Sequence, residues 1–162
     1  MKGIILLLLV ALSPVTTFAQ TPVLFVGDSL TAGYGIDKTK TYPVLVKQHL
    51  KIKYNKEIKV INGSVSGATS ASAVSRIKWF TRAKPQVLVL ALGANDGLRG
   101  INLDQTKKNL DQAIKLGLSK NMKVVLAGMM LPPNYGKDYT DKFRKMYFDL
   151  KRKQNISYPF FT

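Results

Sequence analysis

Residues 23–35 read VLFVGDSLTAGYG, an apolar run that ends in a loop rich in glycine and small polar residues. The run has no alternation of apolar and polar positions, which indicates a strand buried on both faces, as in a parallel sheet. Similar apolar runs lie at residues 59–61, 87–92 and 124–129, and each ends in Gly, Asn or a turn. We therefore expect four parallel strands, and residues 156–161 can form a fifth.

Helical patterns separate these strands. Pro43 can occupy the first turn of a helix that runs to about Leu50. Thr69 can cap a helix through Arg82, and Asn102 can cap another. After the fourth strand an apolar stripe at helical spacing is expected to face the core, formed by Tyr139, Phe143, Met146, Tyr147 and Leu150. The alternation predicts an α/β fold, a flavodoxin-like three-layer α/β/α sandwich with a parallel sheet in the order 2-1-3-4-5.

Composition narrows the chemistry. The chain has 162 residues, 46% of them hydrophobic, which suits one domain with a substantial core. It contains no cysteine, which excludes a disulfide scaffold, a thiolate metal site and a cysteine nucleophile. It contains one histidine, His49, which excludes a His-rich metal site. We expect no metal and no cofactor.

The N-terminus has the pattern of a secretory signal peptide. Lys2 precedes an apolar run at residues 4–12, and Thr17-Phe18-Ala19 places small residues at the usual cleavage positions. We expect residues 1–19 to be a signal peptide of an exported protein, periplasmic or secreted by a bacterium, and residues 20–162 to form the folded domain. An uncleaved N-terminal anchor is the alternative.

The charge balance favours anionic partners. There are 25 basic and 9 acidic residues, a formal net charge of +16. Such a charge favours contact with phospholipid head groups, cell-envelope polymers or nucleic acid without choosing among them. Because the lysines are spread through the chain and no basic motif interleaved with aromatic residues occurs, nucleic-acid binding is not expected. Contact with an anionic membrane surface remains an expectation, for a chain expected to be a monomer.

Three polar loops follow the first three strands, at residues 27–35, 62–67 and 93–97. The carboxyl ends of parallel strands lie at one edge of the sheet, and the sheet's winding reverses between strands 1 and 3, where ligands bind. Ser29 and Asn95 should therefore face each other across the crevice. Each loop alone is weak evidence, since a serine after a strand is usually a cap or turn residue.

Taken together, these loops resemble the SGNH (GDSL) hydrolase family. Its first three blocks correspond to Gly27-Asp28-Ser29-Leu30, Gly67 and Gly93-Ala94-Asn95-Asp96. The stretches NDGLRG at residues 95–100 and LPPNYG at residues 131–136 resemble the branch of bacterial periplasmic arylesterases, lysophospholipases and thioesterases. The resemblance extends from about residue 22 to residue 161.

The resemblance implies a serine esterase that acts on a small-molecule or lipid acyl ester or thioester through an acyl-enzyme. It implies that Ser29 is the nucleophile and that the oxyanion hole consists of the backbone N–H groups of Ser29 and Gly67 and the side-chain amide of Asn95. For Asp28 and Asp96 we expect structural hydrogen bonds. A carbohydrate O-acetylesterase on the same scaffold is the alternative enzyme.

The sequence departs from the family in one respect. The family's last block, an Asp-x-x-His that supplies the acid and base of the triad, occurs nowhere in the 162 residues. The final catalytic loop and C-terminal helix are expected to be missing, and His49 is not expected to act as the base. The chain as given should then be inactive, either as a fragment of a longer enzyme or as a natural short form that binds ligand without turnover.

Overall fold

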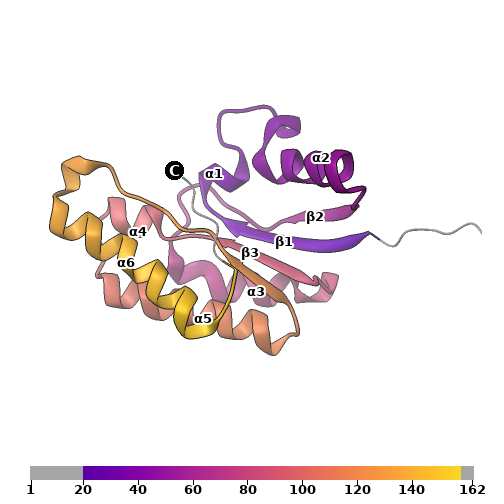
Figure 1. Ribbon diagram of the computed structural model, residues 1–162. Helices are drawn as coiled ribbons and strands as arrows, with labels where there is room; N and C mark the ends of the chain where they lie inside the picture. Colours follow the sequence, from indigo (N-terminus) through magenta and orange to yellow (C-terminus); the bar gives the residue numbers. More distant parts are fainter. Residues whose placement is uncertain (1–19, 158–162) are drawn as a thin grey trace, which may run out of the picture.

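The computed structural model describes residues 20–157, which form a parallel sheet between two layers of helices (Figure 1). The strands are β1 (Thr21–Gly27), β2 (Ile58–Asn62), β3 (Val87–Ala91) and β4 (Lys123–Leu126). The helices are α1 (Ser29–Ala32), α2 (Tyr42–Tyr54), α3 (Ala73–Phe80), α4 (Ala94–Leu98), α5 (Leu103–Ser119) and α6 (Lys137–Gln154). The strand order β2-β1-β3-β4, with every pair parallel, confirms the predicted topology within the described residues.

The predicted fifth strand is described only at its start. Ser157 forms an isolated parallel bridge with Val125, and its carbonyl accepts the N–H of Leu126 at 2.9 Å. The chain therefore returns to the sheet beside β4, the position that the predicted order assigns to a fifth strand. The rest of that predicted strand, residues 158–161, and the predicted signal peptide, residues 1–19, lie outside the described residues.

Both faces of the sheet are covered, which explains the continuous apolar runs. One set of alternating strand residues packs with α3, α5 and α6 in the larger core: Leu24, Val26, Leu88, Leu90, Val124 and Leu126. The intervening residues pack in a smaller cluster with Tyr42 and Leu50 of α2: Val23, Phe25, Val87 and Val89. Figure 1 shows α2 on one side of the sheet and α3, α5 and α6 on the other. None of the helices among the described residues is long and apolar enough to span a membrane.

Two of the three helix-start residues expected from the sequence are confirmed. Pro43 lies in the first turn of α2, and the Asn102 side chain accepts the N–H groups of Asp104 and Gln105 at the start of α5. The expected cap at Thr69 is wrong, because its side chain makes no capping bond and α3 begins only at Ala73. A 3₁₀ turn over residues 70–72 precedes α3. In this turn the buried Ser70 donates its N–H to the Asp96 carboxylate at 2.8 Å.

The apolar stripe of α6 faces the core as expected, with Phe143, Met146, Tyr147 and Leu150 all buried. The Tyr147 hydroxyl donates to the Leu92 carbonyl at 2.9 Å. The next residue, Gly93, has φ +120°, and a Cβ there would lie 2.1 Å from that hydroxyl. The turn that leads from β3 into α4 therefore requires a residue without a side chain, since α6 occupies the space beneath it.

We expect Gly93→Ala to lower the free energy of unfolding by about 2–4 kcal/mol, because the new methyl group meets the buried Tyr147 hydroxyl at a strained φ. Tyr147→Phe alone should cost about 1 kcal/mol through the lost hydrogen bond to Leu92. Urea unfolding of both single variants and the double variant measures the coupling. The double variant should be more stable than the sum of the two costs by about 1 kcal/mol; strict additivity would show that the methyl group is accommodated elsewhere.

Candidate active site

The loops after β1 and β2 are joined on both sides of Ser29. The Val65 N–H donates to the Gly27 carbonyl at 3.1 Å, and the Asn62 side-chain amide donates to the Thr31 carbonyl at 3.1 Å. Ser29 lies between these two attachments as the first residue of α1 and is half-buried. The backbone around Ser29 is thus held against the neighbouring loop.

The loops after β2 and β3 are joined through the other two predicted site residues. The Asn95 side-chain amide donates to the Ala68 carbonyl at 3.1 Å, and the Arg99 guanidinium donates to the Gly67 carbonyl at 3.2 Å. The Asn95 amide has two N–H donors, and the second has no partner among the described residues. Gly67 has φ +75°, a conformation that favours glycine. The structure therefore brings Gly67 and Asn95 together at the carboxyl edge of the sheet.

Asp28 and Asp96 have the structural hydrogen bonds that the sequence led us to expect. The buried Asp28 carboxylate accepts the Leu30 N–H at 3.0 Å and caps α1. The buried Asp96 carboxylate accepts the N–H of Ser70 at 2.8 Å, the hydroxyl of Ser70, and the hydroxyl of Thr106 at 3.3 Å. Asp96 thereby connects α4, which carries Asn95, to the start of the α3 region and to α5.

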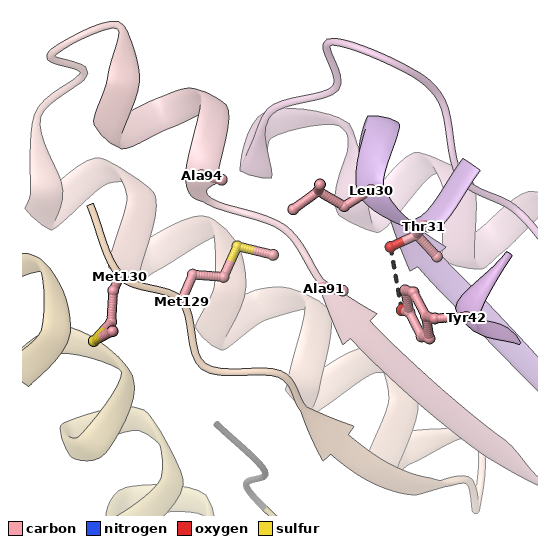
Figure 2. A pocket seen from close by; sticks show the side chains of 7 residues that line it. All are labelled: Leu30, Thr31, Tyr42, Ala91, Ala94, Met129 and Met130. Carbon is pink, nitrogen blue, oxygen red and sulfur yellow. Dashed lines mark hydrogen bonds between the residues drawn. The ribbon is translucent and has the colours of Figure 1, made fainter. Parts of the chain in front are cut away.

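An apolar cavity of about 390 Å³, in the size range of small-molecule sites, is lined by the chain neighbours of Ser29 and Asn95 (Figure 2). It is lined by Leu30, Thr31, Tyr42, Ala91, Ala94, Met129 and Met130. Leu30 follows Ser29 in the chain, and Ala94 precedes Asn95. The Thr31 and Tyr42 hydroxyls hydrogen-bond to each other at 3.2 Å, so the two polar side chains in the wall are paired.

Sequence reasoning missed four of these wall residues: Tyr42, Ala91, Met129 and Met130. Tyr42 directly precedes the Pro43 of the predicted helix, and Met129 falls at the end of the predicted fourth strand. That strand prediction was too long, because β4 ends at Leu126, although Ala127 still donates its N–H to the Leu90 carbonyl at 2.9 Å and Gly128 still forms a bridge. Met129 and Met130 therefore lie in a loop that reaches the cavity. Nothing in their local sequence marks them as wall residues.

The raised pKa of Tyr42 argues against a role for this residue as general base. Burial raises the pKa of Tyr42 to about 12; the hydrogen bond with Thr31 opposes this, and the charge of Asp28 adds to it. The phenol is therefore neutral near pH 7 and is a poor general base there.

His49 lies away from the cavity, as expected. It is exposed on α2, where its ring contacts the edge of the Tyr54 ring at a centroid distance of 6.1 Å. Seven residues separate it from Tyr42, about 10 Å along the helix axis. Within residues 20–157 no group of three histidine, cysteine, aspartate or glutamate side chains could hold a metal ion.

A parallel α/β/α sandwich with a Gly-Asp-Ser-Leu turn beside an apolar cavity defines a class of serine acylhydrolases. The chain belongs to the GDSL-like lipase/acylhydrolase family, whose sequence profile matches residues 25–158. It is 37% identical to the arylesterase of Vibrio mimicus over 145 residues, 88% of this chain and 72% of that protein. It is 33% identical to the thioesterase 1/protease 1/lysophospholipase L1 of Escherichia coli, over 88% of this chain and 68% of that protein.

Solved structures agree with the sequence relatives. AlinE4, an SGNH-hydrolase family esterase, superposes with a TM-score of 0.83 at 32% identity, covering 88% of this chain and 77% of that one. These likenesses confirm the predicted fold class and identify the protein as a serine esterase of the GDSL family.

The pKa of Asp28 yields a test of its structural role. Burial raises this pKa above its ordinary value of 3.8; the Leu30 N–H opposes the shift and the charge of Asp96 adds to it. The folded state then binds the proton more tightly than the unfolded state, so stability is lost as pH rises from 3.8 through the folded pKa. Asp28→Asn keeps an acceptor for Leu30 and should gain stability relative to wild type over that window, as measured by urea unfolding against pH.

Asp37→Asn is the control, because the pKa of Asp37 is shifted in the opposite direction. Hydrogen bonds from the hydroxyl and N–H of Thr39 lower the pKa of Asp37, so its contribution is present above 3.8 and is lost as pH falls through the folded pKa. This variant should lose stability relative to wild type as pH rises. Parallel pH profiles for the two variants would contradict the assignment of Asp28.

Proposed function

We propose that Ser29 is the nucleophile of an esterase that hydrolyses acyl esters or thioesters through an acyl-enzyme. The observation that supports this proposal is the joining of the Ser29, Gly67 and Asn95 loops by hydrogen bonds next to an apolar cavity. A nucleophile, oxyanion donors and a binding pocket are the parts that acyl transfer requires in one place.

In the proposed reaction the Ser29 oxygen attacks the carbonyl carbon and gives a tetrahedral intermediate. The backbone N–H groups of Ser29 and Gly67 and the free N–H of Asn95 would stabilise the oxyanion. Neither backbone N–H is used in a hydrogen bond within the described residues. Collapse of the intermediate expels the protonated alcohol or thiol, and water then releases the acid from Ser29.

The cavity favours an acyl chain longer than acetyl. Its wall is formed mainly by Leu30, Ala91, Ala94, Met129 and Met130, and the hydroxyls of Thr31 and Tyr42 bond to each other. A sugar bearing an acetyl group would instead need wall groups that accept and donate hydrogen bonds to its hydroxyls. We therefore favour an aliphatic or aromatic acyl ester over a carbohydrate O-acetyl ester.

The general base is the part that these 162 residues do not supply. The sequence contains no Asp-x-x-His, His49 is exposed on α2, and the pKa of Tyr42 is about 12. We propose that this polypeptide alone has no Ser29-dependent turnover and that an Asp-x-x-His segment completes its site. A binding protein without turnover is the competing function, and it predicts that such a segment adds nothing.

We expect a fusion of the chain to a family segment that carries Asp-x-x-His to hydrolyse p-nitrophenyl esters, with butyrate or hexanoate preferred to acetate. Ser29→Ala in this fusion should lower kcat by about 10³-fold or more, because removing a triad nucleophile leaves only binding and oxyanion stabilisation. The unfused chain should show no difference between wild type and Ser29→Ala. Ser29-independent turnover by the fusion would remove the nucleophile assignment.

We expect Asn95→Ala in the same fusion to lower kcat by about 10²–10³-fold with little change in KM, because an oxyanion donor acts mainly in the transition state. Steady-state kinetics with p-nitrophenyl butyrate give both constants. Asn134→Ala, in the exposed turn after β4, is the control and should change neither. A change confined to KM would instead make Asn95 a substrate-binding residue.

A further inference from the structure

One side of α2 exposes apolar side chains to solvent. Ile52 is 85% exposed and Leu45 is 48% exposed. At 100° per residue, Leu45, His49 and Ile52 fall within about 60° of one another around the helix. The buried Pro43 and half-buried Leu50 lie on the opposite side, toward the sheet. The helix is therefore apolar on two faces, and only one of them contributes to the core.

The loop before α2 extends this surface. Tyr34 is 79% exposed and Ile36 is 52% exposed. Figure 1 shows that the chain between α1 and α2 lies on the same side of the sheet as α2. We call the exposed residues of this loop and of the outer side of α2 the α2 surface: Tyr34, Ile36, Lys38, Lys40, Leu45, Ile52 and Lys53.

The positive charge of the α2 surface is largely uncompensated. Between residues 34 and 56 there are six lysines and one acidic residue, Asp37. Among the lysines of α2, only Lys51 forms an ion pair within the described residues, with Glu57. Every other ion pair described lies on α5 and α6, where Asp111, Asp141 and Asp149 neutralise nearby basic side chains. The stretch from residue 34 to residue 56 therefore carries a local net charge of +5.

This side of the sheet also carries the entrance of the cavity. Tyr42, the first residue of α2, lines the cavity together with Leu30, which is 69% exposed (Figure 2). A partner that covered the α2 surface would lie next to the cavity that the proposed function assigns to the acyl chain.

We propose that the α2 surface docks the protein on an anionic lipid surface and places the cavity opening at the membrane. Exposed apolar side chains flanked by lysines, on a helix that lies along the surface of the fold, match the requirements of interfacial binding. The lysine stems can extend so that their ammonium groups reach the lipid phosphates while Ile52 and Leu45 enter the acyl boundary. A second copy of the chain fits poorly, because a two-fold contact would place lysines against lysines.

The proposal uses the proposed function only to say why a lipid surface matters, and its test involves no turnover. The protein is taken from Gln20, since the described sheet and core begin at Thr21 and the apolar run at residues 4–12 would bind lipid by itself. Sedimentation with vesicles of phosphatidylcholine and 30% phosphatidylglycerol should show binding that falls with salt, and vesicles of phosphatidylcholine alone should bind far less.

Two variants of the α2 surface should lose binding to the anionic vesicles. Lys38→Gln/Lys53→Gln should lower the partition coefficient about 25-fold, at roughly fivefold for each lysine near the lipid surface. Ile52→Gln should lower it about fivefold or more through the lost apolar contact. The matched controls are Lys78→Gln/Lys120→Gln and Trp79→Gln, all exposed positions on the α3 and α5 side. These should change binding less than about threefold, because that side lies beyond a Debye length from the lipid.

The single tryptophan, Trp79 on α3, allows an independent readout. Its emission should not shift when anionic vesicles are added, whereas Ile52→Trp in a Trp79→Phe background should shift to the blue. Equal losses in the test and control variants, no binding to anionic vesicles, or a blue shift of Trp79 itself would each overturn the proposal. A change from dimer to monomer in light scattering caused by Ile52→Gln would also overturn the proposal, since the α2 surface would then be a self-association interface.

Discussion

The buried carboxylate of Asp96 is the interaction on which the arrangement of the site depends. It accepts the N–H and hydroxyl of Ser70 and the hydroxyl of Thr106, and so connects three segments that are distant in sequence. A buried carboxylate is costly unless its hydrogen bonds are satisfied, so these partners cannot separate independently. Since α4 carries both Asp96 and Asn95, the same interaction positions the Asn95 amide relative to the loop of Gly67.

The site divides its chemistry between the backbone and the cavity wall. Polar contacts hold the three loops through main-chain carbonyls at Gly27, Thr31, Gly67 and Ala68. The Asn95 amide makes one of these contacts and keeps its second N–H unpaired among the described residues. The wall is apolar because its two hydroxyls satisfy each other and because the pKa of Tyr42 keeps that phenol neutral. Such a wall selects for an apolar group, whereas the loops are suited to charge that develops at a carbonyl.

The charge of the molecule has two different structural settings. On α5 and α6 the lysines are paired with aspartates at helical spacing or across the two helices, for example Lys115 with Asp111 and Lys107 with Asp149. On α2 they are mostly without carboxylate partners among the described residues. A formal net charge of +16 therefore does not by itself select one side of the molecule, because basic residues lie on both sides of the sheet.

The sequence by itself determined the α/β fold, the strand order through β4 and the loops that carry Ser29, Gly67 and Asn95, because apolar runs and turn residues are local signals. It also placed the α6 stripe and the Asn102 cap correctly. Only the tertiary structure decided that Ser70 binds Asp96 and that α3 starts late, since a buried partner 26 residues away outweighs a local cap. Likewise, Tyr42, Met129 and Met130 come together at the cavity only in the folded chain, since Tyr42 starts α2 and the two methionines follow β4, and no local pattern records a contact between such distant segments.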